Sequence, residues 1–387
     1  MKFFFHSVKK PHSIQENDWK NWKWQLKKLA NPYLESKELI NFVAGATPYY
    51  YQLISSSKNS NLKKIIQPDI MENSQGLQSM LDPLGEVKHS PNPNLIHRYP
   101  DRVLFLVTDM CGVYCRYCTR KRFTGKKAAL VSKVNYEKSL SYIKNNQGIR
   151  EVILSGGDPL TLSDSILEKI LQDLRRIDHI EIIRIGSRMP LVCPMRFTKP
   201  LLQILKKHQP VFLLTHFNHP YEISKEVAET LNAIADSGIL IFNQTVLLNG
   251  INNHPVLIQA LMRRLLYLRV KPYYMFQCDP SEGSDHFRTS IQNSEWIQQE
   301  LWGYLSGLAM PNLSVDLPDG GGKIPIIPNF LQKKSKKGWA YKGWDGMTKT
   351  YKNPDTSQLK MPTDIESYEE EWLQIKNQEY GLVKKAS

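Results

Sequence analysis

Short runs of apolar, β-branched residues recur through the middle of this chain, and they limit the possible folds more than any other feature of the sequence. Stretches with helical spacing, such as 162–177 and 224–238, separate the middle runs. This alternation predicts about six βα units around a parallel sheet, either doubly wound or closed into an incomplete barrel. The predicted strands lie at 103–109, 151–158, 180–187, 211–217, 239–245, 273–279 and 313–319.

Polar residues gather where each predicted strand ends. Asp109 and a group of cysteines follow the first strand. In parallel α/β folds the carboxyl ends of the strands carry the chemistry. The sequence therefore predicts an enzyme whose site lies at this end of the sheet. The later polar segments are 155–158, 186–188, 215–219, 243–245, 277–279 and 315–323.

The regions on either side of this alternation differ from it in composition and in residue pattern. Residues 1–98 are predicted to form an N-terminal helical region and connector, with helical spacing at 18–34 and a turn-rich end. Residues 99–330 contain the predicted barrel. Residues 331–387 are basic, aromatic and polar, and we predict that they form a C-terminal extension.

The composition excludes several classes of protein. No apolar stretch approaches the ~18 residues of a membrane span, and the apolar run near the N-terminus is too short for a signal peptide. Five cysteines, an odd number, do not suggest a disulfide framework, so we predict a cytoplasmic protein with reduced thiols. The net charge of +14 is scattered and accompanies no nucleic-acid-binding motif. We therefore expect no membrane or nucleic-acid partner.

Cys111, Cys115 and Cys118 follow the first predicted strand with C-x3-C-x2-C spacing. A structural zinc site normally has four protein ligands, and no second C-x2-C or matching histidine pair lies nearby. A redox pair of Cys115 and Cys118 would leave Cys111 unused. Three thiolates suit a [4Fe–4S] cluster with one iron free to bind S-adenosylmethionine. This loop resembles that of the radical S-adenosylmethionine (radical SAM) superfamily.

Two further segments suggest ligand binding. "LSGGDPL" places Gly156, Gly157 and Asp158 one βα unit after the cysteine loop, where glycines permit close backbone approach and a carboxylate can meet an ammonium group. "DLPDGGGK" presents Lys323 after a glycine run, and it is not a P-loop because Ile324 follows the lysine. These residues alone leave two interpretations open, a flexible turn or a lysine that forms a Schiff base with pyridoxal phosphate.

Several segments together resemble the lysine 2,3-aminomutase family, in the same order and over roughly residues 18–330. The resemblance implies an α/β fold, a partial (βα)6 TIM-type barrel of the radical SAM type. It also implies an isomerase that interconverts L-lysine and L-β-lysine by radical 1,2-amino migration, with a [4Fe–4S] cluster, S-adenosylmethionine and pyridoxal 5′-phosphate as cofactors. An electron donor such as flavodoxin or ferredoxin and a homo-oligomeric state are further expectations. The segments are "RYPDRVLFLVTDMCGVYCRYCTRKRFTG", "EVILSGGDPLTLSD", "THFNHPYEIS", "NQTVLLNGINN", "YYMFQCDPSEGSDHFRT" and "VDLPDGGGKIPIIPN".

The resemblance assigns cofactor-binding residues by motif. Lys323 matches the catalytic lysine that holds pyridoxal phosphate, and Arg102 matches the arginine that binds its phosphate, a task suited to a permanently charged fork of donors. His216 and Gln244 are equally compatible with packing roles. The assigned residues are Cys111, Cys115 and Cys118 for the cluster, Lys323, Arg98, Tyr99 and Arg102 for pyridoxal phosphate, and Gly156, Gly157, Asp158, Ser187, His216 and Gln244 for S-adenosylmethionine.

The substrate-binding residues also follow from the resemblance. Arg120 matches the arginine that pairs with the substrate carboxylate. Asp279 and Asp316 match two carboxylates around the ε-ammonium of lysine, since a buried cation must be paired. Glutamate-using relatives lack this acidic pair, so lysine is favoured over glutamate. Charge alone does not exclude arginine, and either aspartate is also compatible with capping a turn.

Two features depart from the family pattern. Well-known members carry a cysteine-rich tail that binds zinc, whereas this tail has no cysteine, so no zinc site is expected. Asp319 stands where a further glycine often precedes the lysine, and it adds negative charge beside the proposed Schiff base. Alternative functions are an aminomutase of arginine or glutamate, an aminomutase acting on a lysine side chain of an elongation factor, and a basic iron–sulfur protein that binds nucleic acid.

Overall fold

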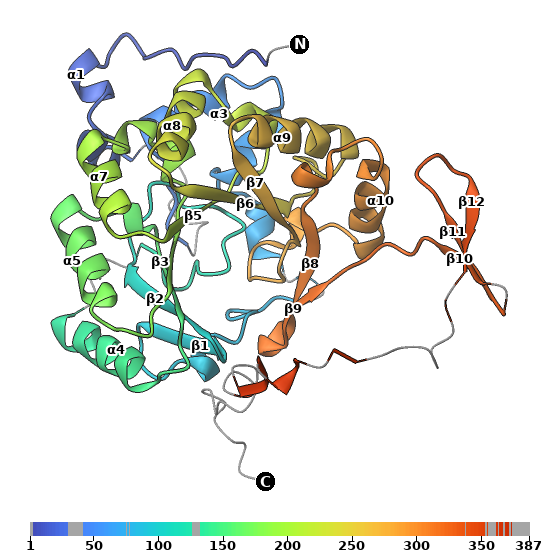
Figure 1. Ribbon diagram of the computed structural model, residues 1–387. Helices are drawn as coiled ribbons and strands as arrows, with labels where there is room; N and C mark the ends of the chain where they lie inside the picture. Colours follow the sequence, from blue (N-terminus) through green and yellow to red (C-terminus); the bar gives the residue numbers. More distant parts are fainter. Residues whose placement is uncertain are drawn as a thin grey trace.

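Nine strands form the central sheet of the computed structural model, and the sheet curls into a nearly closed barrel (Figure 1). The strands are β1 (Leu95–Tyr99), β2 (Arg102–Thr108), β3 (Glu151–Gly156), β4 (Ile182–Gly186), β5 (Val211–Thr215), β6 (Leu240–Leu247), β7 (Val270–Gln277), β8 (Asn312–Leu317) and β9 (Gly322–Pro325). Strands β2 to β8 pair in parallel in chain order, and β1 and β9 add antiparallel edges. The predicted α/β partial barrel is confirmed. The structure describes residues 3–29, 42–74, 76, 78–125, 132–336 and 338–352, with isolated positions between 354 and 373.

Helices cover the outside of the barrel and alternate with its parallel strands, as predicted (Figure 1). They are α4 (Lys133–Asn145), α5 (Asp164–Arg175), α6 (Met189–Val192), α7 (Lys199–Lys207), α8 (Lys225–Asp236), α9 (Pro255–Tyr267) and α10 (Ile291–Leu301). In α5, Leu167, Ile170 and Leu174 recur at helical spacing and are buried. Ser163 begins this helix, because its hydroxyl accepts a hydrogen bond from the Ile166 N–H.

The N-terminal region contains short helical elements rather than a long helix. The segment 18–34 was predicted to be helical, and its described part, 18–29, contains the end of α1 and all of α2. Residues 30–34 lie outside the described part. β1 lies within the turn-rich segment that we predicted to be a connector. The division into 1–98, 99–330 and 331–387 stays a prediction. The N-terminal elements are α1 (Glu16–Trp19), α2 (Trp22–Lys27), α3 (Pro48–Ser55), η2 (Ser60–Ile65), η3 (Ile70–Asn73) and η4 (Val87–His89).

This N-terminal region braces the loop that carries the three cysteines. The Thr47 N–H donates to the carbonyl of Gly112 at 3.0 Å, and the Tyr114 N–H donates to the carbonyl of Gly45 at 2.8 Å. A third backbone hydrogen bond joins Arg116 to Ile65 at 2.8 Å. The loop is thus fixed from outside by backbone hydrogen bonds before any cofactor binds.

The two edges of the sheet are joined by side chains and not by strand pairing. β1 and β9 end the sheet order, which leaves a seam between them. The Tyr99 hydroxyl on β1 accepts a hydrogen bond from the Lys323 N–H on β9 at 3.1 Å. Next to it, the Arg98 guanidinium donates to Oδ1 of Asp316 on β8 at 2.9 Å. Residues predicted for the functional site therefore also hold the edges of the barrel together.

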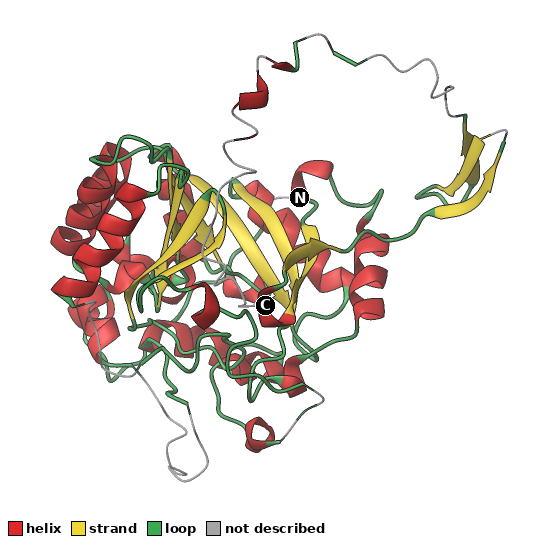
Figure 2. Ribbon diagram, turned by 90° about the horizontal axis from the view of Figure 1, so that it is seen from below, coloured by secondary structure: helices red, strands yellow, loops and turns green. Residues whose placement is uncertain are grey.

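A separate three-stranded antiparallel sheet follows the barrel. It consists of β10 (Leu331–Ser335), β11 (Gly338–Lys342) and β12 (Thr348–Tyr351), and it projects away from the barrel (Figures 1 and 2). Trp344 in the β11–β12 turn contacts Tyr304 beyond α10, with ring centroids 5.9 Å apart. This sheet lies in the segment predicted to be a C-terminal extension.

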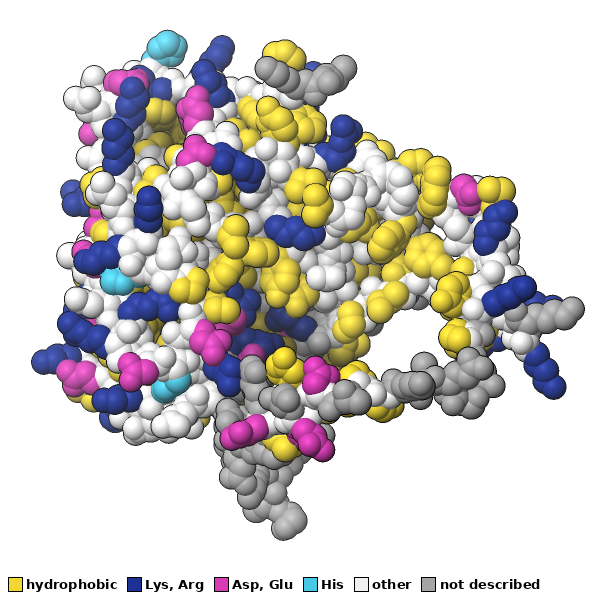
Figure 3. All heavy atoms as spheres, viewed as in Figure 1, with side chains coloured by type: hydrophobic (Ala, Val, Ile, Leu, Met, Phe, Trp, Pro, Cys, Tyr) yellow, Lys and Arg dark blue, Asp and Glu magenta, His cyan; other side chains and the backbone are white. Residues whose placement is uncertain are grey.

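The surface does not show one continuous basic patch on the face seen in Figure 3. Lys and Arg side chains are interspersed there with Asp and Glu, and hydrophobic side chains gather toward the centre. Among the described residues, no helix combines the length and apolarity that crossing a membrane requires. The cytoplasmic location stays a prediction.

Candidate active site

One cavity of about 820 Å³ lies inside the barrel and reaches from Arg102 and Glu151, at the starts of β2 and β3, to the cysteine loop at the carboxyl ends of the strands. Every residue that the sequence predicted for the site lines it, including Cys111, Lys323 and Asp316. This placement follows from the parallel order of β2 to β8, because the loops after parallel strands meet at one end of a barrel. The structure thus brings the predicted residues together, and the individual roles stay predictions.

The three cysteine thiols of the loop after β2 are partly buried and free of disulfides. Burial, followed by the neighbouring Cys118, raises the pKa of Cys111 well above its usual value, so a bound cation is needed to keep this thiol deprotonated. Within the described chain, no group of three His, Cys, Asp or Glu side chains is arranged around a single metal ion. In a [4Fe–4S] cluster each cysteine binds a different iron, so three thiols on one loop would supply three of the four ligands.

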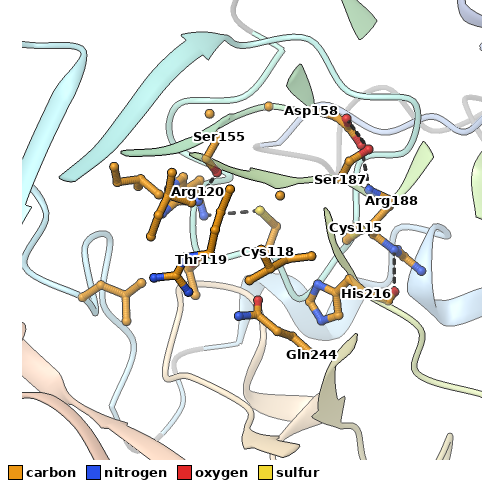
Figure 4. Close-up of a pocket in the computed structure, with 18 of the residues that line it drawn as sticks. Cys115, Cys118, Thr119, Arg120, Ser155, Asp158, Ser187, Arg188, His216 and Gln244 are labelled. Carbon is orange, nitrogen blue, oxygen red and sulfur yellow. Dashed lines mark hydrogen bonds between the residues drawn. The ribbon is translucent and has the colours of Figure 1, made fainter. Parts of the chain in front are cut away.

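Arg188 is a buried contact of the cysteine loop that sequence reasoning did not single out. Its Nη1 donates to Sγ of Cys115 at 2.7 Å, and both residues are labelled in Figure 4. Its Nη2 donates to Glu222 at 2.8 Å and to the Tyr50 hydroxyl at 3.1 Å. A positive charge here favours the thiolate that iron requires. The only signal in the sequence was its position directly after the polar end of β4, in "GSR".

Gly156 and Gly157 bring the end of β3 against the cysteine loop. A Cβ on Gly156 would lie 2.2 Å from the Thr108 carbonyl, and one on Gly157 would lie 2.2 Å from the Met110 carbonyl. The Gly157 N–H donates to the Thr108 carbonyl at 2.6 Å. We expected these glycines to admit a ligand, whereas the observed close approach is to the protein backbone that leads into the cysteines.

The Asp158 carboxylate is already surrounded by donors. Oδ1 accepts from the Ser187 hydroxyl at 2.7 Å and from the Leu160 N–H at 3.0 Å, and Oδ2 accepts from the Arg188 N–H at 2.8 Å (Figure 4). Burial nevertheless raises the pKa of Asp158. A ligand ammonium here would therefore share the carboxylate with these donors, and Asp158 also positions Ser187 and Arg188 at the cavity.

His216, directly after β5, and Gln244, within β6, face the cavity (Figure 4). Nε2 of His216 is buried and has no hydrogen-bond partner among the residues that the structure describes. Burial, with Arg188 nearby, lowers the pKa of His216 to about 3, so the ring is neutral near pH 7. An unpartnered buried nitrogen in a cavity is a position where a polar ligand such as S-adenosylmethionine fits.

Lys323 lies on strand β9, directly after the glycine run. β9 pairs with β8, and the register places Lys323 directly opposite Asp316. Gly320 and Gly322 have φ of +79° and +87°, which allow the chain to turn sharply between the two strands. Asp319 is exposed and does not line the cavity, and its effect on the charge beside Lys323 stays a prediction. Its φ of +56° is one that aspartate tolerates.

Two arginines, Arg102 and Arg184, line the same cavity as this lysine. The guanidinium of Arg102 stacks over the Tyr99 ring, 4.1 Å from the centroid. Burial would raise the pKa of Tyr99, but hydrogen bonds from the Lys323 N–H and from Arg98 outweigh burial and lower it. Arg184 on β4 lines the same cavity, and burial lowers its pKa, with the charge of Arg102 adding to the effect. Two arginines close enough to repel each other fit the phosphate of pyridoxal phosphate.

Sequence reasoning missed Arg184, although a signal was present. A charged residue inside the apolar run of β4 is unusual, because a strand of a parallel sheet is normally apolar on both faces. Arg184 forms an ion pair with Glu151 on the neighbouring strand β3. Both side chains of this ion pair lie on the strand faces that point into the cavity.

Two aspartates supply negative charge to the cavity. Burial, and next the charge of Asp316, raise the pKa of Asp279 to about 7. Asp316 is 6% exposed and contacts both Arg98 and the Lys323 ammonium. Asp316 already pairs with two cations, whereas Asp279 forms no ion pair within the described chain, so Asp279 is the carboxylate open to a further cation.

Arg120 supplies the positive end of the cavity. Its Nη1 donates to the Ser155 hydroxyl at 3.2 Å, and Glu86 accepts two further hydrogen bonds from it. Glu86 was missed by sequence reasoning, because a glutamate in a Pro- and Gly-rich segment gives no local signal. The thiol of Cys193 is fully buried, and that of Cys278 is buried beside Asp279.

Comparisons with known proteins agree with this geometry. The family model for the radical SAM superfamily matches residues 105–258, and the model described as lysine-2,3-aminomutase matches residues 298–384. L-lysine 2,3-aminomutase of Fusobacterium nucleatum is 40% identical over 373 residues, which cover 92% of this chain and 88% of the relative. The enzyme of the same name from Clostridium subterminale is 40% identical, with 88% and 86% covered. Glutamate 2,3-aminomutase of Clostridioides difficile is 39% identical, with 86% and 82% covered.

Among solved structures, SuiB of Streptococcus suis bound to its precursor peptide SuiA is 13% identical. It covers 56% of this chain and 49% of its own, with a TM-score of 0.43. The relatives at 40% identity are matched over most of their length, and the two family models match successive parts of this chain. This chain therefore belongs to the lysine 2,3-aminomutase family of radical SAM aminomutases.

Proposed function

We propose that this protein interconverts L-lysine and L-β-lysine. The reaction would use a [4Fe–4S] cluster on Cys111, Cys115 and Cys118, S-adenosylmethionine beside it, and pyridoxal phosphate on Lys323. When bound, the cluster and S-adenosylmethionine supply a radical that abstracts hydrogen, and pyridoxal phosphate makes the substrate amino group able to migrate. Superfamily membership implies the first two cofactors, and pyridoxal phosphate is inferred from the family.

One observation supports lysine as the substrate. A primary ammonium, that of Lys323, lies 3.0 Å from Oδ2 of Asp316 inside the cavity. Asp279 is close enough to have its pKa raised by Asp316, so the two carboxylates together attract a further cation. The ε-ammonium of lysine supplies that cation, whereas the side-chain carboxylate of glutamate would be repelled.

The chain's own residues orient this substrate between two charged ends. Arg120 would hold the α-carboxylate, and Asp279 with Asp316 would hold the ε-ammonium. Buried surroundings exclude water and strengthen each of these contacts. The β-carbon would then lie where the radical forms, because both ends of the substrate are fixed.

The competing substrates have less support from these residues. A glutamate aminomutase is among the relatives at 39% identity, so overall similarity does not choose between lysine and glutamate. The acidic pair argues against glutamate, and arginine is distinguished only by experiment. A lysine side chain of a protein would have to enter through the mouth of the cavity. The electron donor, the oligomeric state and the absence of zinc stay predictions.

The experiment that tests the proposal is an anaerobic assay. The protein is reconstituted with iron, sulfide, pyridoxal phosphate and S-adenosylmethionine, reduced, and given L-lysine, L-glutamate or L-arginine separately. We expect β-lysine from the unmutated protein and no product from Lys323→Ala or Cys115→Ala. Isomerisation of another amino acid, with lysine unchanged, would overturn the substrate assignment.

A further inference from the structure

Glu86 lies at the wall of the cavity beside Arg120, and its position in the backbone is fixed. Its N–H donates to Oδ1 of Asp82 at 3.0 Å, and the next residue, Val87, donates to Oδ2 of the same carboxylate at 2.9 Å. The Glu86 side chain is only 7% exposed. A buried carboxylate of this kind needs charged or polar partners.

Two arginines supply those partners. Oε1 of Glu86 accepts from Nε of Arg120 at 2.9 Å and from Nη2 of Arg120 at 2.6 Å. Oε2 accepts from Nη2 of Arg122 at 3.0 Å. Burial would raise the pKa of Glu86, but Arg120 and Arg122 outweigh it and lower the pKa, so the carboxylate is ionised.

The edge of Arg120 that Glu86 occupies decides which donors remain. A guanidinium carries five N–H donors, and it binds a carboxylate either along the Nε/Nη2 edge or along the Nη1/Nη2 end. Glu86 fills the Nε/Nη2 edge, and the Ser155 hydroxyl lies 3.2 Å from Nη1. The Nη1/Nη2 end is left for a ligand, with a serine hydroxyl next to it that can donate as well.

We propose that Glu86 is a positioning residue for the carboxylate of the substrate. By holding one edge of Arg120, it aims the other edge and the Ser155 hydroxyl at the place where the carboxylate binds. This inference rests on the proposed function, because it takes an amino acid as the ligand of Arg120. It goes further by naming the group that orients that arginine and the edge that reads the carboxylate.

Glu86 also contributes to the charge balance of the subsite that would bind the carboxylate. Arg120 and Arg122 carry two positive charges, and Glu86 and Asp82 carry two negative charges around them. The ligand carboxylate therefore enters a subsite whose charges are already balanced. The affinity for this carboxylate therefore depends more on the geometry of the Arg120 guanidinium than on an excess of positive charge.

The test compares L-lysine with L-lysinamide, which lacks the carboxylate but keeps both amines. Dissociation constants for each are measured by calorimetry on the anaerobic holoenzyme. We expect the wild type to bind lysine at least roughly tenfold more tightly than lysinamide, and Glu86→Gln to reduce this preference by about tenfold or more. Lysinamide affinity should change by less than about twofold, which a general loss of structure would not reproduce.

Two further variants complete the experiment. Glu137→Gln makes the same chemical change on α4, where the side chain is 61% exposed, and should leave the preference intact. Glu86→Asp keeps the charge but shortens the reach, and we expect an intermediate preference. If Glu86→Gln does not bind iron and pyridoxal phosphate, Glu86→Asp still tests the positioning role.

The possible outcomes are distinct. If Glu86→Gln keeps the wild-type preference, or if the wild type does not prefer lysine over lysinamide, the positioning role is wrong. If the wild type prefers lysine and loses that preference in Glu86→Gln, yet does not isomerise lysine, the role of Glu86 stands and the proposed reaction fails.

Discussion

The side-chain ammonium of Lys323 lies 3.0 Å from Oδ2 and 3.2 Å from Oδ1 of Asp316, its partner across the β8–β9 ladder. The lysine proposed to hold pyridoxal phosphate thus rests on a carboxylate proposed to hold the substrate ammonium. This ion pair links cofactor binding to substrate binding, because Lys323 must leave Asp316 before it can bind the cofactor. Its departure leaves Asp316 paired with Arg98 alone, so one cation fewer competes with the substrate ammonium for the carboxylate.

The first prediction is that Asp316→Asn has opposite effects on two ligands. Pyridoxal phosphate should bind as well as in the wild type or more tightly, since no ion pair has to break. Lysine should bind at least about tenfold more weakly, because a buried charged partner is lost. Absorbance titration measures the first and calorimetry the second. Asp319→Asn, at an exposed position outside the cavity, is the matched control. Parallel losses for both ligands would contradict this link.

The second prediction concerns pH. Burial and Asp316 raise the pKa of Asp279 to about 7, so this carboxyl is mostly protonated at pH 6 and mostly ionised at pH 8. Only the ionised form pairs with a substrate ammonium, so KM for lysine should fall roughly tenfold over that interval. In Asp279→Asn the KM should be higher and should lose this pH dependence. An unchanged pH profile in the variant would show that another group titrates.

Asp279 also makes a stability prediction with a definite sign. Its pKa is higher in the folded protein than in the unfolded chain, so its contribution to the free energy of unfolding is lost as pH rises through about 7. Without ligands, Asp279→Asn should therefore be more stable than the wild type at pH 8, by on the order of 1–3 kcal/mol. The gain should shrink by pH 6. Thermal unfolding at both pH values measures it, with the exposed Asp236→Asn as control.

Arg188 should set the reduction potential of a cluster on the cysteine loop. It donates to Sγ of Cys115, so Arg188→Gln should make the potential more negative by roughly 60–120 mV, the one-electron equivalent of a charge-assisted hydrogen bond of about 1.5–3 kcal/mol. Glu222→Gln should shift it the opposite way, because Glu222 partly neutralises Arg188. Spectroscopic redox titration measures both. Arg176→Gln, 67% exposed, should leave the potential unchanged. Shifts of the same sign at both positions would point to loosened structure.

Gly157→Ala should disturb the cysteine loop. The added Cβ would lie 2.2 Å from the Met110 carbonyl, so backbone must shift, at a cost of about 1–3 kcal/mol. Because that carbonyl leads directly into Cys111, we expect a lower iron content per chain as well as a lower Tm. Gly307→Ala is the matched control, since a Cβ there has no atom within 4 Å. Full iron loading in Gly157→Ala would show that the loop tolerates the displacement.

The sequence predicted most of the barrel for a physical reason. Strands β2 to β8 are buried by helices, so their apolar runs are long enough to recognise, and α5 shows its buried face at clear helical spacing. The edge strands gave no such pattern. β1 reads "LIHRY" and β9 reads "GKIP", which mix charged, glycine and proline residues because their pairing depends on tertiary contacts.

The site was predictable where chemistry fixes spacing and not where it depends on distant partners. Cys111, Cys115 and Cys118 lie within one loop, and Lys323 follows a glycine run, so each could be found locally. Glu86 reaches Arg120 across 34 positions of the chain, and no local pattern marks such a contact. The register that sets Lys323 against Asp316 likewise appears only once β8 and β9 pair.

The seam between β1 and β9 constrains how the specificity of this chain can evolve. Asp316 is both a proposed contact of the substrate and the partner of Arg98 across the seam. A single substitution that suits Asp316 to another substrate would leave Arg98 with a buried, unpaired charge at the edge of the barrel. Divergence toward a new substrate therefore requires a second, compensating change on β1. Such paired steps are rarer than single ones, so the seam slows changes of substrate class.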